Sequence, residues 1–353
     1  MIDLRSDTLT LPDRPMLETI LTAHLGDDGR LNAAGRGEDA TVNRLEDMSA
    51  ALTGKEAGLL CTSGTLGNQA AVLTWCRPGD TVLVNDLQHL DRSEKTAFDP
   101  RFGQMKKAIY HLDANFQPDL AEIEAQCKTG KVKLLCLENT HNYTGGTCIT
   151  EASLKKIHDL ASQYHVPVHM DGARLFNASL YLKTPVDQLC QYVDSVQFCF
   201  SKGLGAPVGS VLCGSRDFIR NAKETRKLMG GAMRQAGIIA APAIYALEHN
   251  IQRLQEDHDN CATKFPYNYL ELSQETISVN SSLPGFEHFK SVALRLKDEE
   301  NLSSGDAEIL IHFWSFIAGL ALLVRSPVGE SFKENDVQKT VRTMLDIYIK
   351  GDS

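Results

Sequence analysis

The sequence predicts an α/β fold in which a mostly parallel, seven-stranded sheet carries helices on both faces. Short apolar runs of strand character recur along the first part of the chain, and helix-length segments separate most of them. Several of these runs end at Gly, Ser or Asp, which are common turn residues. Strands joined by helical crossovers lie parallel, and a parallel sheet is buried on both faces.

The strands are expected at residues 57–61, 80–84, 107–112, 132–137, 166–170, 195–200 and 208–213. Before the first strand, Thr41 is a predicted cap for a helix that ends at Gly54. After it, Pro78 and Gly79 close a second helix. One long helical stretch is expected over residues 235–265.

The length of 353 residues predicts two domains. We expect residues 1–250 to form a large ligand-binding domain that begins with an N-terminal arm. Residues 251–353 are expected to form a smaller α+β domain that ends in a helix.

Composition excludes several classes of partner. The net charge of -9 argues against nucleic acid or an anionic membrane. No apolar run is long enough to cross a bilayer, and the N-terminus has no apolar signal core. Nine cysteines without a C-x-x-C pair fit reduced thiols, so a cytoplasmic location is expected.

Residues 196–205 (VQFCFSKGLG) organise the predicted site. An apolar run stops at Ser201 and Lys202 and passes into glycines, which allow a sharp turn and the close approach of a ligand. A lysine at the end of a buried strand is desolvated, which is expected to lower its pKa and free the amine as a nucleophile. Such a lysine can form a Schiff base with pyridoxal 5'-phosphate (PLP). The alternative is a surface lysine in a glycine-rich loop.

A carboxylate follows an earlier predicted strand. Residues 166–174 (VPVHMDGAR) place Asp171 at the strand's carboxyl end. PLP chemistry needs an anion against the pyridine nitrogen, because a protonated ring is the better electron sink. One helical crossover separates this strand from the one before Lys202, so both ends can face the same edge of the sheet. Together, Asp171 and Lys202 indicate a PLP site more strongly than either does alone.

Residues 62–65 (TSGT) form a candidate phosphate cup where a strand passes into a helix. Ser63 and Thr65 supply hydroxyls, Gly64 admits phosphate oxygens to the main chain, and the helix N-terminus supplies N–H groups. The alternative is a turn without a ligand. No G-x-x-x-x-G-K-[ST] occurs, and no G-x-G-x-x-G follows a strand, which argues against a nucleotide site.

Two histidines and two arginines are further candidates. His89 and His141 follow predicted strands, so their imidazoles can stack on a pyridine ring or move protons near neutral pH. Arg174 and Arg325 can hold a substrate carboxylate. The alternatives are hydrogen-bonding loop histidines and surface ion pairs. No metal site is predicted, because the other histidines lack metal-ligand spacing.

Several motifs together resemble the L-threonine aldolases over about residues 1–262. They are LRSDT (4–8), SGT (63–65), ENTHN (138–142), DGARLFN (171–177), SKGLGAPVGS (201–210), GGAMRQ (230–235) and LQEDHD (254–259). The family is PLP-dependent, of fold type I, and forms dimers or tetramers with shared active sites. The resemblance therefore implies a homo-oligomer, and a homotetramer is the expected form.

The resemblance also implies roles for single residues. Lys202 would form the Schiff base, Asp171 would face the pyridinium, His89 would lie over the cofactor ring and His141 would lie near the substrate hydroxyl. Lys202, His89 and His141 are the implied catalytic residues.

Ser6, Arg174 and Arg325 would hold the substrate carboxylate, and Arg174 is also counted among the cofactor-binding residues. Arg234 would reach a cofactor phosphate, across a subunit boundary. The sequence departs from the family pattern at Arg36 and Ala40, where relatives carry an aromatic residue and a proline. The approach at residues 29–34 is also longer, and residues 95–97 replace glycines. These changes touch the expected substrate entrance.

The expected function is the cleavage of L-threonine or L-allo-threonine to glycine and acetaldehyde. One alternative is a PLP-dependent β-eliminating lyase, or an aldolase for another β-hydroxy amino acid. Another is a catalytically silent PLP-fold protein with a structural or regulatory role, although such a protein has no need of both Asp171 and Lys202.

Overall fold

A computed structural model describes residues 6–264, 270–272 and 277–279, with side chains to residue 260. The chain divides into two compact units, Arg5–Glu256 and Asp257–Ser353 together with Met1–Leu4. Most of the second unit lies outside the described residues. The α+β character of that region and the division at residue 250 therefore stay predictions.

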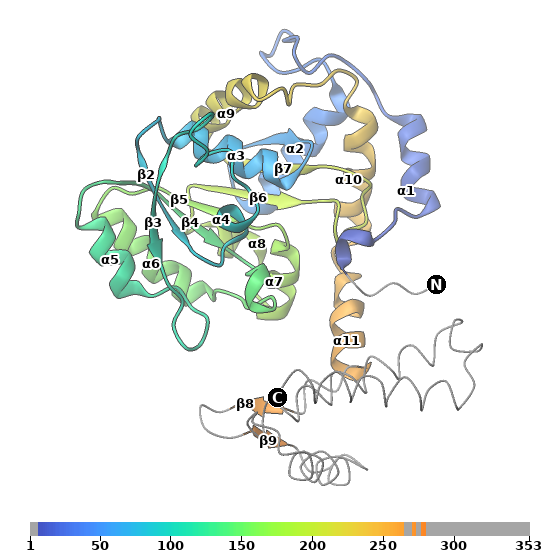
Figure 1. Ribbon diagram of the computed structural model, residues 1–353. Helices are drawn as coiled ribbons and strands as arrows, with labels where there is room; N and C mark the ends of the chain where they lie inside the picture. The colour runs from blue at the N-terminus through green and yellow to red at the C-terminus, as the bar shows by residue number, and fades with distance from the viewer. Residues whose placement is uncertain (1–5, 265–269, 273–276, 280–353) are drawn as a thin grey trace, which may run out of the picture. The chain divides into compact units, whose positions relative to one another are not determined.

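A seven-stranded sheet forms the centre of the Arg5–Glu256 unit (Figure 1). Its strands are β1 (Ala57–Cys61), β2 (Thr81–Asn85), β3 (Lys106–Tyr110), β4 (Val132–Glu138), β5 (Val168–Asp171), β6 (Ser195–Cys199) and β7 (Ser210–Gly214). The strand order is β1-β7-β6-β5-β4-β2-β3. β7 runs antiparallel to both of its neighbours, and the other pairings are parallel. The predicted α/β fold with a mostly parallel, seven-stranded sheet is confirmed.

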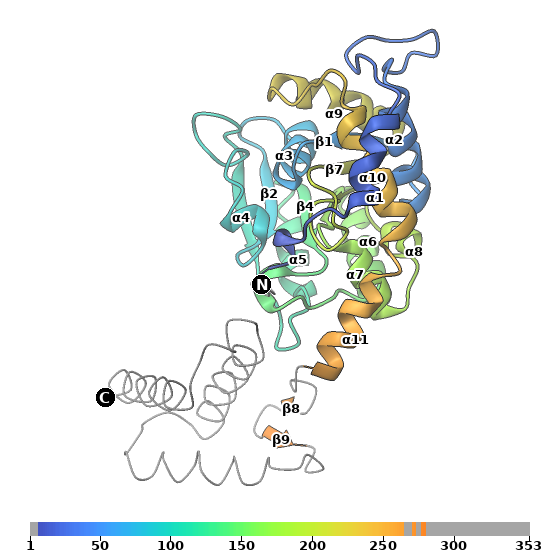
Figure 2. The ribbon, with the colours of Figure 1, turned by 90° about the vertical axis from the view of Figure 1, so that its right-hand side faces the viewer.

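The helices of this unit precede, connect and follow the strands. The α-helices are α1 (Arg14–Glu18), α2 (Ala40–Thr53), α3 (Gly64–Trp75), α4 (His89–Arg92), α5 (Leu120–Cys127), α6 (Glu151–Gln163), α7 (Leu175–Leu182), α8 (Val186–Cys190), α9 (Arg216–Leu228) and α10 (Gly237–His249). Three short 3-10 helices are η1 (Asp7–Leu9), η2 (Thr19–Thr22) and η3 (Asn142–Thr144). α11 (Leu254–Lys264) spans the division between the two units. α10 packs against α2 and α1, and Figure 2 shows these three helices side by side.

The sheet is apolar on both faces, because alternate residues of a strand point to opposite sides. Leu135 and Leu137 of β4 pack into the core that contains residues of α2, α6, α7 and α8. Leu134 and Cys136 of the same strand belong to the second core, which contains Val72 of α3. All four β4 side chains are fully buried. Helices on both faces bury this surface.

The cap of α2 differs from the sequence prediction. The helix begins at Ala40, and its N-cap is Asp39, whose carboxylate accepts a hydrogen bond from the Val42 amide at 3.0 Å. Thr41 instead bonds to the His24 backbone through its hydroxyl. A carboxylate caps a helix as well as a hydroxyl does, so the first of two adjacent candidates is used. Gly54 ends the helix at a φ of 64°, as predicted.

The long helix predicted over residues 235–265 is two helices, α10 and α11. Asn250 is the C-cap of α10. Its side chain is buried, and its Nδ2 donates to the Leu204 carbonyl at 2.7 Å. This tertiary hydrogen bond ties the helix end to the loop that carries Lys202. Periodicity alone did not show the interruption.

Beyond α11, β8 (Leu270–Leu272) and β9 (Ile277–Val279) form an antiparallel pair. The predicted C-terminal helix lies outside the described residues. No helix in the described part of the chain is long and apolar enough to cross a membrane.

Candidate active site

The predicted site residues meet at the carboxyl edge of the sheet. Asp171 is the last residue of β5, and it lies in register with Glu138 at the end of β4 and with Gln197 on β6. Lys202 follows the end of β6 by three residues. His89 begins α4, just beyond β2, and lies next to Glu94 in the folded chain. The loops that follow β2, β4, β5 and β6 thus bring residues from positions 89 to 202 to one edge, as an open α/β sheet does at a ligand site.

Asp171 is a buried carboxylate whose oxygens are both hydrogen-bonded. Oδ2 accepts from Asn68 Nδ2 at 2.8 Å, and Oδ1 accepts from the Ala173 amide at 3.0 Å. Burial raises the pKa of Asp171, and the Glu94 carboxylate raises it further. The charges of Lys202 and His89 oppose this rise. The carboxylate therefore sits where an additional cation would stabilise its ionised form.

His89 is paired with a second buried carboxylate. His89 Nδ1 lies 3.0 Å from Glu94 Oε1, and the Glu94 side chain is only 2% exposed. The hydrogen bond to Glu94 raises the pKa of His89, against the opposing effect of burial. Asn68 Nδ2 also donates to Glu94 Oε1 at 3.1 Å, so one amide connects Glu94 to Asp171.

Glu138 fixes the loops that carry the two histidines. Its Oε2 accepts from the His89 amide at 2.6 Å, and its Oε1 accepts from the Asn142 amide at 2.8 Å. Burial and the neighbouring Asp171 charge raise the pKa of Glu138 to about 7. Both partners in these contacts are backbone amides, so Glu138 positions the backbone of the two loops.

His141 is buried at 4% exposure. Its Nε2 lies 3.2 Å from Asn85 Oδ1, whereas its Nδ1 is buried without a hydrogen-bond partner in the described part of the chain. Burial lowers the pKa of His141, although Asp171 and Asp86 oppose this effect. A neutral imidazole at this position can accept a proton.

Arg174 is held by the N-terminal arm. Its Nε and Nη2 donate to the two carboxylate oxygens of Asp7 at 2.7 and 2.6 Å, and Nη1 donates to Asn142 Oδ1 at 3.1 Å. Ser6 lies beside this pair as the exposed N-cap of η1, and its hydroxyl accepts from the Thr8 amide at 3.2 Å. A guanidinium has five N–H groups, so two remain available for a substrate carboxylate.

The predicted phosphate cup lies at the N-terminus of α3. Ser63 is the N-cap, and its hydroxyl accepts from the Leu66 amide at 3.1 Å. Ser63 and Thr65 are exposed. A Cβ added to Gly64 would meet the Cys199 sulfur at 2.8 Å, so only glycine fits there without a shift. The exposed hydroxyls and the helix N-terminus leave this turn open to an anion.

No described contact connects Arg234 with this cluster. Arg234 is mostly exposed, and its Nε lies 3.2 Å from Asp27 Oδ2. Its role at a cofactor phosphate, across a subunit boundary, stays a prediction. Arg325 lies outside the described residues, and its role in holding a carboxylate also stays a prediction.

Asn68 and Glu94 are two residues of this cluster that the sequence did not single out for a role. Asn68 lies one helical turn after Gly64 on α3, and Glu94 follows His89 by five residues. Both spacings can be seen in the sequence, but neither shows which way the side chain points. His169, which precedes Met170 on β5, lies between Ser195 Oγ and Asn68 Oδ1 and contacts both. Burial lowers the pKa of His169 to about 4.

The ligand atoms of His89, Glu94 and Asp171 all lie within 4.8 Å of one another. This donor set could surround a cation. Two buried carboxylates and one imidazole suit a metal ion, but they equally suit a protonated ring nitrogen held by Asp171 beside an imidazolium held by Glu94. The sequence predicts no metal, and the second arrangement agrees with the positions of Lys202 and the phosphate cup.

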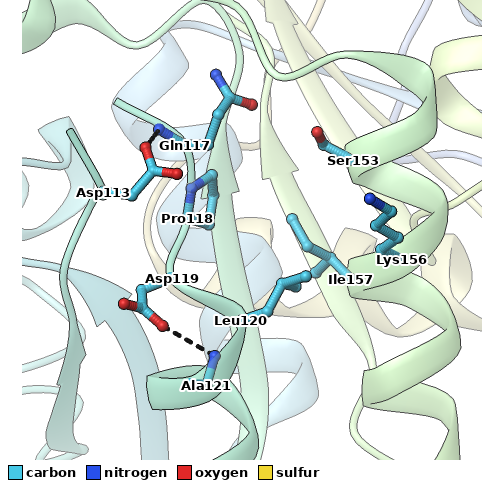
Figure 3. A pocket seen from close by; sticks show the side chains of 9 residues that line it. All are labelled: Asp113, Gln117, Pro118, Asp119, Leu120, Ala121, Ser153, Lys156 and Ile157. Carbon is cyan, nitrogen blue, oxygen red and sulfur yellow. Dashed lines mark hydrogen bonds between the residues drawn. The ribbon is translucent and has the colours of Figure 1, made fainter. Parts of the chain in front are cut away.

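A separate hollow of about 350 Å³ lies between residues 113–121 and α6 (Figure 3). Asp113 and Asp119 point their carboxylates at backbone amides of their own loop, and Lys156, Ser153 and Ile157 face them from α6. None of the predicted site residues lines this hollow. It is therefore distinct from the cluster around Asp171.

Comparison with known proteins identifies the family. The beta-eliminating lyase family matches residues 3–278. Low-specificity L-threonine aldolase 1 of Arabidopsis thaliana is 42% identical over 265 residues, which cover 73% of this chain and 72% of that protein. The low specificity L-threonine aldolase of Escherichia coli K12 is 41% identical over 269 residues, which cover 74% and 77% of the two chains. An uncharacterized protein of Caenorhabditis elegans is 41% identical over 267 residues, and the match spans 63% of its length.

A solved structure agrees with the fold. The threonine aldolase of Leishmania major aligns with a TM-score of 0.60 at 19% identity, over 73% of this chain and 76% of that one. The resemblance seen in the sequence motifs is thereby confirmed by family, by relatives and by fold. The chain belongs to the beta-eliminating lyase family, in the group of the low-specificity L-threonine aldolases.

Proposed function

We propose that the protein is a PLP-dependent carbon–carbon lyase that cleaves L-threonine or L-allo-threonine to glycine and acetaldehyde. The names of its relatives support the reaction class. One structural observation carries the proposal. The buried Asp171 carboxylate lies beside the His89–Glu94 pair, on the strand next to the one that delivers Lys202.

The residues present fit the cofactor. Burial and Glu94 leave the Asp171 carboxylate with a raised pKa, so a protonated pyridine nitrogen would supply the cation that this site favours. When bound, PLP supplies an electron sink for the negative charge left on the substrate's Cα. Lys202 would hold the cofactor through its amine, Asp171 through the ring nitrogen and His89 against the ring face. Ser63, Gly64 and Thr65 would hold the phosphate, with Arg234 as a further contact.

Arg174 would bind and orient the substrate carboxylate. Asp7 and Asn142 occupy three of its five N–H groups, which fixes the guanidinium plane and leaves two donors. Two parallel N–H groups match two carboxylate oxygens. Ser6 and Arg325 are the other proposed contacts for this carboxylate.

His141 would take the proton of the substrate's β-hydroxyl, directly or through a water that it orients. Burial lowers its pKa, so the imidazole is neutral near pH 7 and can act as a base. As the O–H bond breaks, the oxygen forms the carbonyl of acetaldehyde and the Cα–Cβ bond breaks. The electron pair stays on Cα, which then takes a proton to give glycine.

Two other functions use the same residues. A β-eliminating lyase would release the β-substituent and yield a 2-oxo acid with ammonia, and an aldolase for a larger substrate would release a different aldehyde. The family name favours the first, and the chain's own residues at the expected substrate entrance, such as Arg36, favour the second. A catalytically silent protein is disfavoured because Lys202 and Asp171 are both in place.

We also propose a homo-oligomer, a dimer or a tetramer, with active sites shared between subunits. Sharing would allow the exposed Arg234 to reach a cofactor bound by another subunit. The cytoplasm is the proposed compartment. Eight cysteines in the described part of the chain are free thiols, which fits a reducing environment.

Replacement of Lys202 with Ala tests the proposal. We expect the purified wild-type protein to carry a visible PLP absorption that borohydride bleaches and fixes covalently to the chain. Lys202→Ala should lose the covalent attachment and almost all aldehyde release. Lys227→Ala, an exposed lysine of α9, is the matched control and should behave as wild type. Covalent fixation in Lys202→Ala at the wild-type level would contradict the proposal.

A further inference from the structure

His141 makes an asymmetric set of contacts. Its Nε2 faces Asn85 Oδ1 at 3.2 Å, and its Nδ1 is buried without a partner among the described residues. The side chain is 4% exposed and that of Asn85 is fully buried. A buried polar atom without a partner is uncommon in a native protein and calls for an explanation.

The orientation of the Asn85 amide is fixed by its other contacts. Asn85 Nδ2 donates to the Tyr110 carbonyl at 2.9 Å, and Oδ1 accepts from the Leu87 amide at 3.0 Å. Exchange of the two amide atoms would set an oxygen against the Tyr110 carbonyl and an NH2 group against the Leu87 N–H. Both contacts would be lost, so the amide oxygen is the atom that faces His141.

The tautomer of His141 follows from this orientation. An amide oxygen only accepts, so the hydrogen of the contact must lie on His141 Nε2. Burial keeps the ring neutral, with Asp171 and Asp86 as the acidic groups that act against this effect. In a neutral ring that carries its hydrogen on Nε2, the Nδ1 atom keeps a free lone pair.

We propose that Asn85 is a positioning residue that fixes His141 in the Nε2–H tautomer and makes Nδ1 the basic atom of the site. The inference rests on the proposed function, because it assigns the atom that takes the β-hydroxyl proton. The O–H bond of the substrate breaks, and an N–H bond forms at Nδ1 while acetaldehyde leaves. Cα takes one proton from solvent, and Nδ1 later releases one proton to solvent, so the reaction is balanced.

The charge formed on His141 is also met by Asn85. A protonated ring donates from both nitrogens, and the Nε2–H remains directed at the amide oxygen. Asn85 also belongs to the β2–β3 pairing, where it lies in register with Tyr110. The sheet edge therefore holds the amide in place without a contribution from the substrate.

Nitrogen-15 NMR of the holoenzyme labelled at histidine tests the tautomer directly. His141 is assigned by the loss of its signals in His141→Gln. We expect a pyridine-type Nδ1 and a pyrrole-type Nε2 for His141 in the wild type at neutral pH. A pyrrole-type Nδ1 would overturn the proposal, whether or not the protein cleaves threonine.

Asn85→Ala tests the positioning role. We expect mixed His141 tautomers and a kcat lower by roughly tenfold, which is part of the 10²–10⁴-fold that a general base contributes. PLP content and KM should stay within twofold of wild type. His169 is the internal control, because Asn68 and Ser195 hold it and its signals should not move.

An unchanged kcat in Asn85→Ala, or a single unchanged tautomer, would overturn the role of Asn85. If that variant does not fold, the wild-type tautomer still decides the inference. Failure of the proposed function gives a different result. The tautomer would then be as predicted, but no β-hydroxy amino acid would release an aldehyde, and only the role of Nδ1 in that reaction would be lost.

Discussion

Glu94 and Asp171 are two buried carboxylates that share the amide of Asn68. Burial and the nearby Glu94 charge raise the pKa of Asp171, and the charges of Lys202 and His89 oppose this rise. Glu94 contacts the His89 ring at 3.0 Å. The proposed function assigns Asp171 to the cofactor. At the scale of single residues, the proposed site thus has one carboxylate for the imidazole and another for the pyridinium.

Glu94→Gln should lower the pKa of His89, because the charged hydrogen-bond partner that raises it is removed. The change is measured by following the His89 ring through a pH titration by NMR. Glu122→Gln is the control, since it alters an exposed His–Glu pair, with His111, elsewhere on the surface. A His89 pKa that is the same in Glu94→Gln as in wild type would show that Glu94 does not set the charge of this ring.

Asp7→Asn should weaken substrate binding through Arg174. The carboxylate that fixes two sides of the guanidinium becomes an amide, and a lost charge-assisted hydrogen bond costs about 1.5–3 kcal/mol when fully felt. Both partners are about one-quarter exposed, so we expect a smaller effect, with KM higher by roughly three- to tenfold and kcat changed less.

Asp13→Asn is the matched control for Asp7→Asn. It lies in the same arm and caps α1 through a contact of 2.9 Å to the Met16 amide, which Asn can also make. Its KM should equal that of wild type. Equal KM values in Asp7→Asn and wild type would separate Asp7 from substrate binding.

The sequence predicted Lys202 and Asp171 because each follows a strand and its chemistry is specific to the residue type. Asn68 could not be predicted in the same way. Its partners Asp171 and Glu94 are 103 and 26 residues away, and an asparagine on a helix indicates no partner by itself. The pairing of Arg174 with Asp7, 167 residues apart, was hidden for the same reason.

At the scale of elements, α2 carries a buried glutamate against β1. Glu46 is buried, its Oε1 accepts from the Leu60 amide at 3.0 Å, and burial raises its pKa from 4.5 to about 7. In the unfolded chain the group titrates near its ordinary value. The folded state therefore binds the proton more tightly between these two pH values.

The contribution of Glu46 to the free energy of unfolding should fall as pH rises from 4.5 to 7, by about 3 kcal/mol at the conversion of 1.36 kcal/mol per pKa unit. Glu46→Gln keeps an acceptor for Leu60 but cannot ionise, so its unfolding free energy should decline by about 3 kcal/mol less than that of wild type over this pH range. Urea denaturation at pH 5 and pH 8 gives the comparison. Glu18→Gln, an exposed carboxylate of α1, should decline as wild type does. The same decline in Glu46→Gln would contradict the assignment.

Element boundaries show where sequence patterns stop being informative. The start of α2 was misplaced by two residues, since Asp39 and Thr41 both have capping side chains and only the fold decides between them. The interruption between α10 and α11 depends on a hydrogen bond from Asn250 to Leu204, 46 residues away. The strands themselves were predictable, because their apolar runs are short and continuous.

At the scale of the whole molecule, the sheet decides which residues can meet. Helical crossovers imply parallel strands, and the parallel order β6-β5-β4-β2 puts the loops after these strands at one edge. The antiparallel insertion of β7 between β1 and β6 could not be read from spacing. Because β7 is antiparallel to both neighbours, the predicted phosphate cup after β1 lies at the same edge. There the Ser210 hydroxyl donates to the Ser63 carbonyl at 2.6 Å.

The products formed from L-threonine and L-allo-threonine by the PLP-loaded protein test the central claim most directly. The proposed aldolase predicts equal amounts of glycine and acetaldehyde, with the loss of both products in Lys202→Ala. Formation of a 2-oxo acid with ammonia, or no product from any β-hydroxy amino acid, would contradict it.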